Sequence, residues 1–299
     1  MTPLSNIRWT RSGLGALAAV AGVSAAILGG APGPVLAGPG LASDWVDGHA
    51  SRVRMVAGRG LAQGAEAPYI VAGVQIELQP GWKTYWRNPG EAGGVPPYFD
   101  GSKSSNVADA KVVYPAPKRL ADASGDSIGY KNSVVLPVVI TPRDEGRPLH
   151  LKLDFAFGVC REICIPAEAS LSLVVPQGVS LPMPRPLTEA LDHAPRHAAA
   201  RRSGDPELII HEAVLNGKEP RNVLDLKFPG GADQGDVFAE APDGIYLPMA
   251  KRVAGPNGES ARFVIDLRDS FELEDLKGLT ITLTLVGAEG QSERKMPID

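Results

Sequence analysis

The segment Leu149–Cys164 has the sequence LHLKLDFAFGVCREIC, and apolar side chains occupy every second position from Leu149 to Phe157. This period of two predicts a β-strand with one buried and one wet face, because successive side chains on a strand point to opposite faces. The strand runs directly into Gly158-Val159-Cys160, so the cysteine pair is placed at a strand end. Residues Leu171–Val175 predict the return strand, which ends at Pro176-Gln177-Gly178.

The same alternation recurs along the rest of the chain. It appears before the cysteines in Val74–Leu78 and Val134–Ile140, and it resumes after Pro206. The chain also contains 34 Gly and 27 Pro with few aromatic residues, a composition typical of sandwiches rather than helical bundles. The sequence therefore predicts an all-β protein with two β-sandwiches in tandem. The strands predicted for the second sandwich include Leu224–Phe228, Phe263–Leu267 and Ile281–Leu285.

Residues 1–37 have the pattern of a signal peptide. Arg8 and Arg11 supply positive charge, Leu14–Leu28 is an apolar run, and Val35-Leu36-Ala37 offers a small-residue cleavage site. An uncleaved membrane anchor is the alternative, although a span needs about 20 apolar residues and this run is shorter. We expect an exported protein that is not inserted in the membrane after cleavage.

A proline-rich linker over residues 181–203 divides the remaining chain. Pro182, Pro184 and Pro186 precede a short helical pattern, Leu187–Ala194. The predicted domains are therefore a first sandwich over residues 38–180 and a second over 204–299, with few contacts across the linker. The second has no cysteine, and we expect a structural or partner-binding role for it.

The charge balance excludes one class of partner. Thirty basic and 34 acidic residues give a formal net charge of −4, and no block of Lys and Arg stands out. Nucleic acid is therefore not an expected partner.

Cys160 and Cys164 form a C-x3-C motif, and in an oxidising compartment they will meet each other. A bridge across three residues closes a ring of about five and gains only about 2 kcal/mol of stability, which favours exchange over a structural purpose. A local clip that pins a loop stays open as the alternative. A thioredoxin-type site is disfavoured, because Ile165 precedes Pro166 and cannot begin a helix easily.

Metal binding is the other chemistry open to two thiolates. They could hold Cu(I), which would make this a copper-handling protein, or half of a zinc site. His150 is the nearest further ligand, and the pair His193 and His197 is interrupted by Pro195. We therefore predict no metal and no cofactor.

Three stretches resemble one family, the N-terminal periplasmic domain of the thiol:disulfide interchange protein DsbD. They are GWKTYWRNPG at 81–90, GYKN at 129–132, and the cysteine segment that continues through Cys164-Ile165-Pro166-Ala167-Glu168. The resemblance covers roughly Asp44 to Pro176, and the second sandwich is more weakly similar to an extra module of longer relatives. The transmembrane and thioredoxin-like domains of full-length members have no counterpart here, so we expect a stand-alone module.

The resemblance implies an immunoglobulin-like domain in the periplasm that takes part in protein-disulfide reduction. Its dithiol would take electrons from a membrane electron-transfer protein and pass them to thioredoxin-fold proteins. Cys164 would form the mixed disulfide and Cys160 would resolve it. Tyr85 would lie near the pair, under a cap loop at 121–129 that has small residues where other members have aromatics. Further residues expected to line the site are Trp82, Trp86, Asp122 and Tyr130, with core packing open as the alternative for the two tryptophans and Tyr85.

Overall fold

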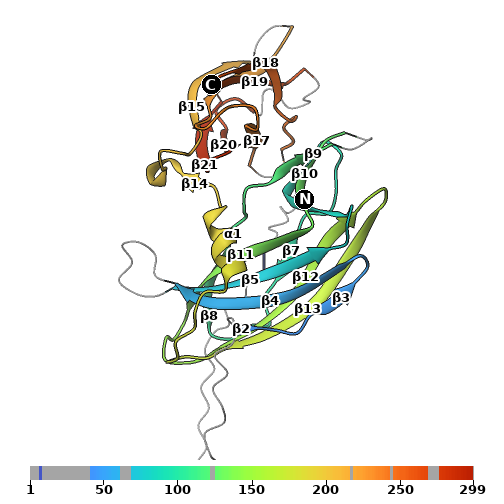
Figure 1. Ribbon diagram of the computed structural model, residues 1–299, viewed down its shortest axis with the longest axis vertical. Coiled ribbons are helices and arrows are strands. Elements are labelled where there is room, and N and C mark those ends of the chain that lie inside the picture. The colour runs from blue at the N-terminus through green and yellow to red at the C-terminus, as the bar shows by residue number, and fades with distance from the viewer. Residues whose placement is uncertain are drawn as a thin grey trace, which may run out of the picture.

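The computed structural model describes residues 7–8, 41–60, 69–121, 125–215, 218–242, 245–268 and 276–298. Apart from two residues, the predicted signal peptide lies outside this set. The described chain is dominated by β-strands that form four sheets in two sandwich-like halves, so the all-β fold class is confirmed (Figure 1). Within the described residues, no helix has the length and apolar character needed to cross a membrane.

Two sheets with a shared core form the first sandwich. Phe99, Leu136 and Phe155 are buried between them, as the alternating patterns require. One sheet runs in the order β1 (Ile7–Arg8), β7 (Tyr98–Asp100), β12 (Leu149–Cys160), β6 (Lys83–Gly90), β10 (Ser127–Lys131) and β9 (Lys118–Leu120), with β13 (Cys164–Val175) paired to β12. The other runs β2 (Leu41–Ala42), β4 (Ser51–Gly60), β5 (Tyr69–Leu78), β11 (Ser133–Pro142) and β8 (Val107–Val112), with β3 (Val46–Gly48) paired to β4.

The second sandwich has a separate core that contains Leu224, Phe263 and Leu283, one from each predicted strand. One sheet runs β14 (Arg196–His197), β21 (Gln291–Pro297), β20 (Thr280–Val286) and β17 (Asp236–Glu240). The other runs β15 (Glu207–Val214), β16 (Arg221–Lys227), β19 (Ser260–Asp266) and β18 (Lys251–Asn257).

The connector between the sandwiches is docked on the first of them. Helix α1 (Arg185–Asp192) begins two residues before the predicted helical pattern, since proline is tolerated in a first helical turn, and it ends before Pro195. Leu187 is fully buried against Val71 and Val135 on the outer face of the β5–β11 sheet. A side chain on Gly73 would collide with Leu187, so this glycine lets the helix approach the sheet. A single-turn 3-10 helix, η1 (Ala198–Ala200), follows β14.

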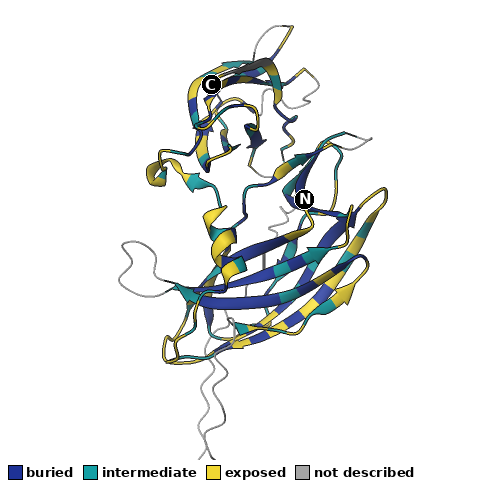
Figure 2. Ribbon diagram, viewed as in Figure 1, coloured by how far each residue is buried: buried dark blue, intermediate teal, exposed yellow. Residues whose placement is uncertain are grey.

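The two sandwiches touch more extensively than the linker composition predicts. Phe238 and Met249 from the second half are buried in the core of the first, and the ring centroid of Phe238 lies 6.0 Å from that of Trp86. Figure 2 shows buried residues on the β-strands of both halves. Alternation identifies the apolar side of a strand but not its neighbour, which is why the sequence did not predict this contact.

Candidate active site

The cysteine pair closes a long hairpin at one end of the first sandwich. Strands β12 and β13 pair without interruption, from Leu149 opposite Val175 to Cys160 opposite Cys164, and a disulfide joins the two cysteines. The return strand thus begins at Cys164 rather than at the predicted Leu171. Pro166 is tolerated in it because β13 is an edge strand with β12 on one side only.

The two sulfur-bearing residues differ sharply in exposure. Cys160 is 1% exposed, because β12 lies between β13 and β6, whereas Cys164 on the edge strand is exposed. Its neighbour Ile163, in the turn that joins the strands, is 74% exposed. A molecule that approaches from solvent therefore meets Cys164 first.

Tyr85 brings a hydroxyl group to both sulfur atoms. Its oxygen lies 2.9 Å from Sγ of Cys160 and 2.8 Å from Sγ of Cys164. Sulfur atoms in a disulfide carry no hydrogen, so the hydroxyl is the donor. Backbone pairing explains the placement: Cys160 lies opposite Lys83 on β6, and Tyr85, two residues further, shares the face of Lys83. The tyrosine is 2% exposed.

Two glycines form a slot around the Tyr85 ring. A methyl group on Gly94, which has φ of +150°, would overlap the ring. A methyl group on Gly158 would lie 3.0 Å from Cδ2 of the ring and 3.0 Å from the carbonyl oxygen of Val95. The sequence analysis missed both residues. The available signal was Gly158 at the point where the strand alternation stops, since glycine inside a strand marks a close approach.

Lys83 was also missed. It is only 6% exposed, and its ammonium group donates a hydrogen bond of 2.9 Å to Oγ of Ser127, at the base of the predicted cap loop. This contact ties β6, which carries Tyr85, to the first residue of β10. Asp122 in that loop lies outside the described residues.

The predicted lining aromatics separate into two groups. Trp82 lies beside the cysteine turn, since the Arg161 guanidinium is 5.4 Å from its ring centroid. Trp86 and Tyr130 lie elsewhere: Trp86 is fully buried in the core, and Tyr130 donates a hydrogen bond of 2.8 Å to the carbonyl of Pro115. Successive residues on a strand face opposite sides, so Trp86 points away when its neighbour Tyr85 points to the sulfurs.

The two histidines that have helical spacing diverge. Nδ1 of His193 lies 2.7 Å from the carbonyl oxygen of Glu189, while His197 is next to Glu293. Across the described ranges, no cluster of three or more His, Cys, Asp or Glu side chains is arranged to hold a metal ion.

Comparison with known proteins finds a family model that matches the segment containing this site. Residues 66–176 match the family model described as thiol:disulfide interchange protein DsbD, N-terminal. The resemblance to the DsbD N-terminal family is confirmed. The match spans β5 to β13, so it contains both cysteines, Tyr85 and both glycines of the slot. The match to this family, together with the Cys160–Cys164 disulfide, supports a thiol–disulfide exchange module.

A solved structure shares the fold well beyond the DsbD-type segment. The N-terminal periplasmic domain of ScsB from Proteus mirabilis superimposes with a TM-score of 0.64 at 20% sequence identity, and the alignment covers 87% of this chain and 98% of that one. An alignment of that extent must include more than half of the second sandwich, so both sandwiches contribute to the shared fold. The curated proteins contain no match to this sequence.

Proposed function

We propose that this protein is a periplasmic thiol–disulfide exchange module that passes electrons through Cys160 and Cys164. The observation that carries the proposal is a disulfide at an exposed hairpin end with the Tyr85 hydroxyl directed at both sulfurs. Residues 1–37 would direct export. The donor would be a membrane electron-transfer protein and the acceptors thioredoxin-fold proteins.

The difference in exposure supports an order of events. In the reduced protein, the Cys164 thiolate attacks one sulfur of a partner disulfide, forms a mixed disulfide and releases the other partner sulfur as a thiolate. The Cys160 thiolate then attacks Sγ of Cys164, which restores the internal disulfide and releases the second partner thiolate. Two electrons pass to the partner, which takes up two protons in becoming a dithiol. Reduction by the donor is the reverse sequence.

Tyr85 would assist both steps through its hydroxyl group. A hydrogen bond to a charged group favours the charged form, so donation from Tyr85 would lower the pKa of the thiol that must react as a thiolate. Hydrogen bonds to charged groups contribute about 1.5–3 kcal/mol, which corresponds to about a tenfold to hundredfold change in an equilibrium. Because the hydroxyl lies within hydrogen-bond distance of both sulfurs, it is positioned to serve each in turn.

Cysteine variants test the assignment of roles. Cys160→Ala should accumulate a mixed disulfide through Cys164 with a thioredoxin-fold protein, visible by mass spectrometry, because nothing remains to resolve it. Cys164→Ala should trap far less, since its remaining sulfur is buried. Equal trapping by both variants would contradict the assignment.

A redox titration separates exchange from a structural clip. Exchange predicts a reduction potential well above about −300 mV. Reduction should also lower the melting temperature by only a few degrees and leave the first sandwich folded, because the small ring contributes about 2 kcal/mol. A potential below that value, or unfolding on reduction, would favour the clip.

A further inference from the structure

Strand β6 is irregular immediately after Tyr85. Gly129 on β10 pairs with Tyr85, but Ser127, two residues away on β10, pairs with Gly90, five residues away on β6. The additional residues of β6 are therefore displaced from the ladder as a bulge, a feature that turns side chains in new directions beside functional sites. Arg87 lies in this bulge and points to the second sandwich.

Arg87 is held by two carboxylates of the second sandwich. Its guanidinium donates to Oε2 of Glu240 on β17 at 2.7 Å and to Oε2 of Glu293 on β21 at 2.9 Å. It also lies 4.3 Å from the ring centroid of Trp86. Burial by itself would lower the pKa of Arg87, but the hydrogen bonds and charges of the two glutamates raise it above its usual value. The contact therefore contains a partly buried guanidinium that stays charged.

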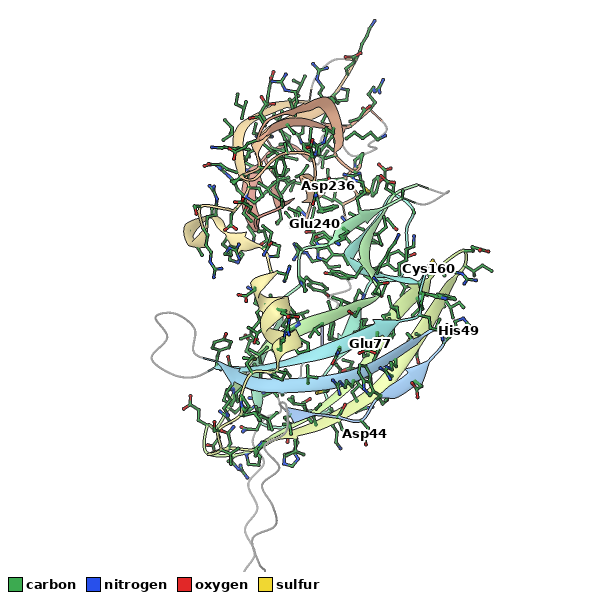
Figure 3. All side chains as sticks on the ribbon, viewed as in Figure 1. Asp44, His49, Glu77, Cys160, Asp236 and Glu240 are labelled. Carbon is green, nitrogen blue, oxygen red and sulfur yellow. A yellow bond between two sulfur atoms is a disulfide. The ribbon has the colours of Figure 1, made fainter. Side chains whose placement is uncertain are left out.

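Two further contacts fasten the same region. Arg119 on β9 donates to Oδ1 of Asp236 and to the carbonyl oxygen of Ala250, both at 2.8 Å. Oε1 of Glu91 accepts a hydrogen bond of 3.1 Å from the backbone N–H of Met249, and Glu91 precedes the slot residue Gly94 by three positions. Figure 3 shows Asp236 and Glu240 on the side of the second sandwich that faces the first.

We propose that the second sandwich is a positioning element of the dithiol site. Its carboxylates hold the β6 bulge two residues after Tyr85, and its Met249 segment holds the loop that carries Gly94. Tyr85 is thereby supported through the backbone of β6 and through the Gly94 side of the slot. This support keeps its hydroxyl within hydrogen-bond distance of both sulfurs. This inference rests on the proposed exchange function and assigns Arg87 as a positioning residue, because its guanidinium contacts carboxylates and not the sulfurs.

Arg87→Met in the full chain tests the proposal, because methionine keeps much of the apolar packing and removes the charge. Oxidation of the reduced protein by glutathione disulfide should slow by about three- to tenfold at neutral pH. The loss is smaller than that of the whole hydrogen bond from Tyr85 to the thiolate, because the hydroxyl is displaced and not removed. The pH midpoint of the rate should rise as thiolate stabilisation weakens. The matched control is Arg262→Met, which breaks the exposed 2.6 Å pair with Asp225 inside the second sandwich and should leave the rate unchanged.

A double-mutant cycle shows whether the effect passes through Tyr85. In a Tyr85→Phe background, Arg87→Met should slow oxidation by less than about twofold, because the hydroxyl that it positions is already gone. An equal loss with and without the hydroxyl, or a rate for Arg87→Met equal to that of Arg262→Met, overturns the proposal. A wild-type chain that exchanges no thiols at all would instead overturn the proposed function.

A second variant covers the case in which Arg87→Met unfolds. Glu293→Gln keeps the size and one acceptor oxygen but removes one charge from the cluster, and circular dichroism confirms its folding. Like Arg87→Met, it should slow oxidation, and only when Tyr85 is present. A folded Glu293→Gln protein with the wild-type rate and pH midpoint also counts against the proposal.

Discussion

Both sandwiches are built from strands with alternating apolar and polar residues, yet they differ in the functional side chains that they position. The first contains a nearly buried sulfur and a tyrosine ring between two glycines, where one added methyl group would collide. In its described part the second has no cysteine, but it places Asp236, Glu240 and Glu293 on the surface that meets the first. The disulfide and Tyr85 thus depend on close packing within the first sandwich. The second sandwich contributes carboxylates that hold the strand carrying Tyr85.

The largest effect is expected in the connector, because its helix α1 packs on the first sandwich. Leu187→Ala should reduce the free energy of unfolding by about 2–5 kcal/mol, because the side chain is fully buried and its loss leaves a cavity. Urea denaturation of the full chain measures the change. The control Arg185→Ala removes only an exposed pair with Glu189 and should change the free energy of unfolding far less. Similar losses for the two variants would show that α1 is not part of the core.

A smaller effect on stability, but a clear one on exchange, is expected in the glycine slot. Gly94→Ala should destabilise the fold by about 1–3 kcal/mol, through backbone strain and collision with Tyr85, and should slow thiol exchange. Gly93→Ala is the matched control. Gly93 also has positive φ, at +68°, but its methyl group would meet open space. Stopped-flow oxidation of both variants separates the two causes: strain affects both, whereas only Gly94→Ala displaces the ring.

The last effect is absent at neutral pH, appears only at alkaline pH and should come from the first sandwich. Burial raises the pKa of Tyr114 and of Tyr130, so both stay neutral in the folded state while the unfolded chain ionises near pH 10. Above that pH the folded state binds more protons than the unfolded state, and stability falls by about 1.4 kcal/mol per pH unit for each tyrosine. Below it the contribution is fully present. Urea unfolding at pH 9, 10 and 11 measures the slope.

Tyr130→Phe tests the origin of that slope. It removes one buried hydroxyl whose pKa is raised, so the loss of stability should be less steep than in the wild type by about 1.4 kcal/mol per pH unit. The variant should also be less stable at neutral pH, since the hydrogen bond to Pro115 is lost. An unchanged slope would place the alkaline sensitivity elsewhere.

Much of this architecture follows from patterns in the sequence. Alternation predicted the strands that became β5, β11 and β12, and Pro166 after Ile165 argued against a helix at the cysteines. The return strand was predicted too short, because its first half carries small and polar residues on an exposed edge, where no apolar alternation is needed.

The residues missed at the site share a physical reason. Gly94 and Gly158 are required because any larger side chain would collide with the Tyr85 ring. This requirement is visible only once the position of that ring is known. The bulge in β6 depends on register with β10, which local sequence does not encode. Arg87 was quoted as part of a motif, but its partners lie more than 150 positions further along the chain.

The burial of Cys160 beside an exposed Cys164 has a kinetic consequence. In the proposed exchange, electrons would enter and leave through the same sulfur atom, so donor and acceptor would occupy the same place and could not be bound together. Turnover should therefore follow ping-pong kinetics, with parallel lines in double-reciprocal plots, and an excess of either partner should inhibit the reaction of the other. The hairpin end thus allows only one partner to bind at a time, whatever the number of partners.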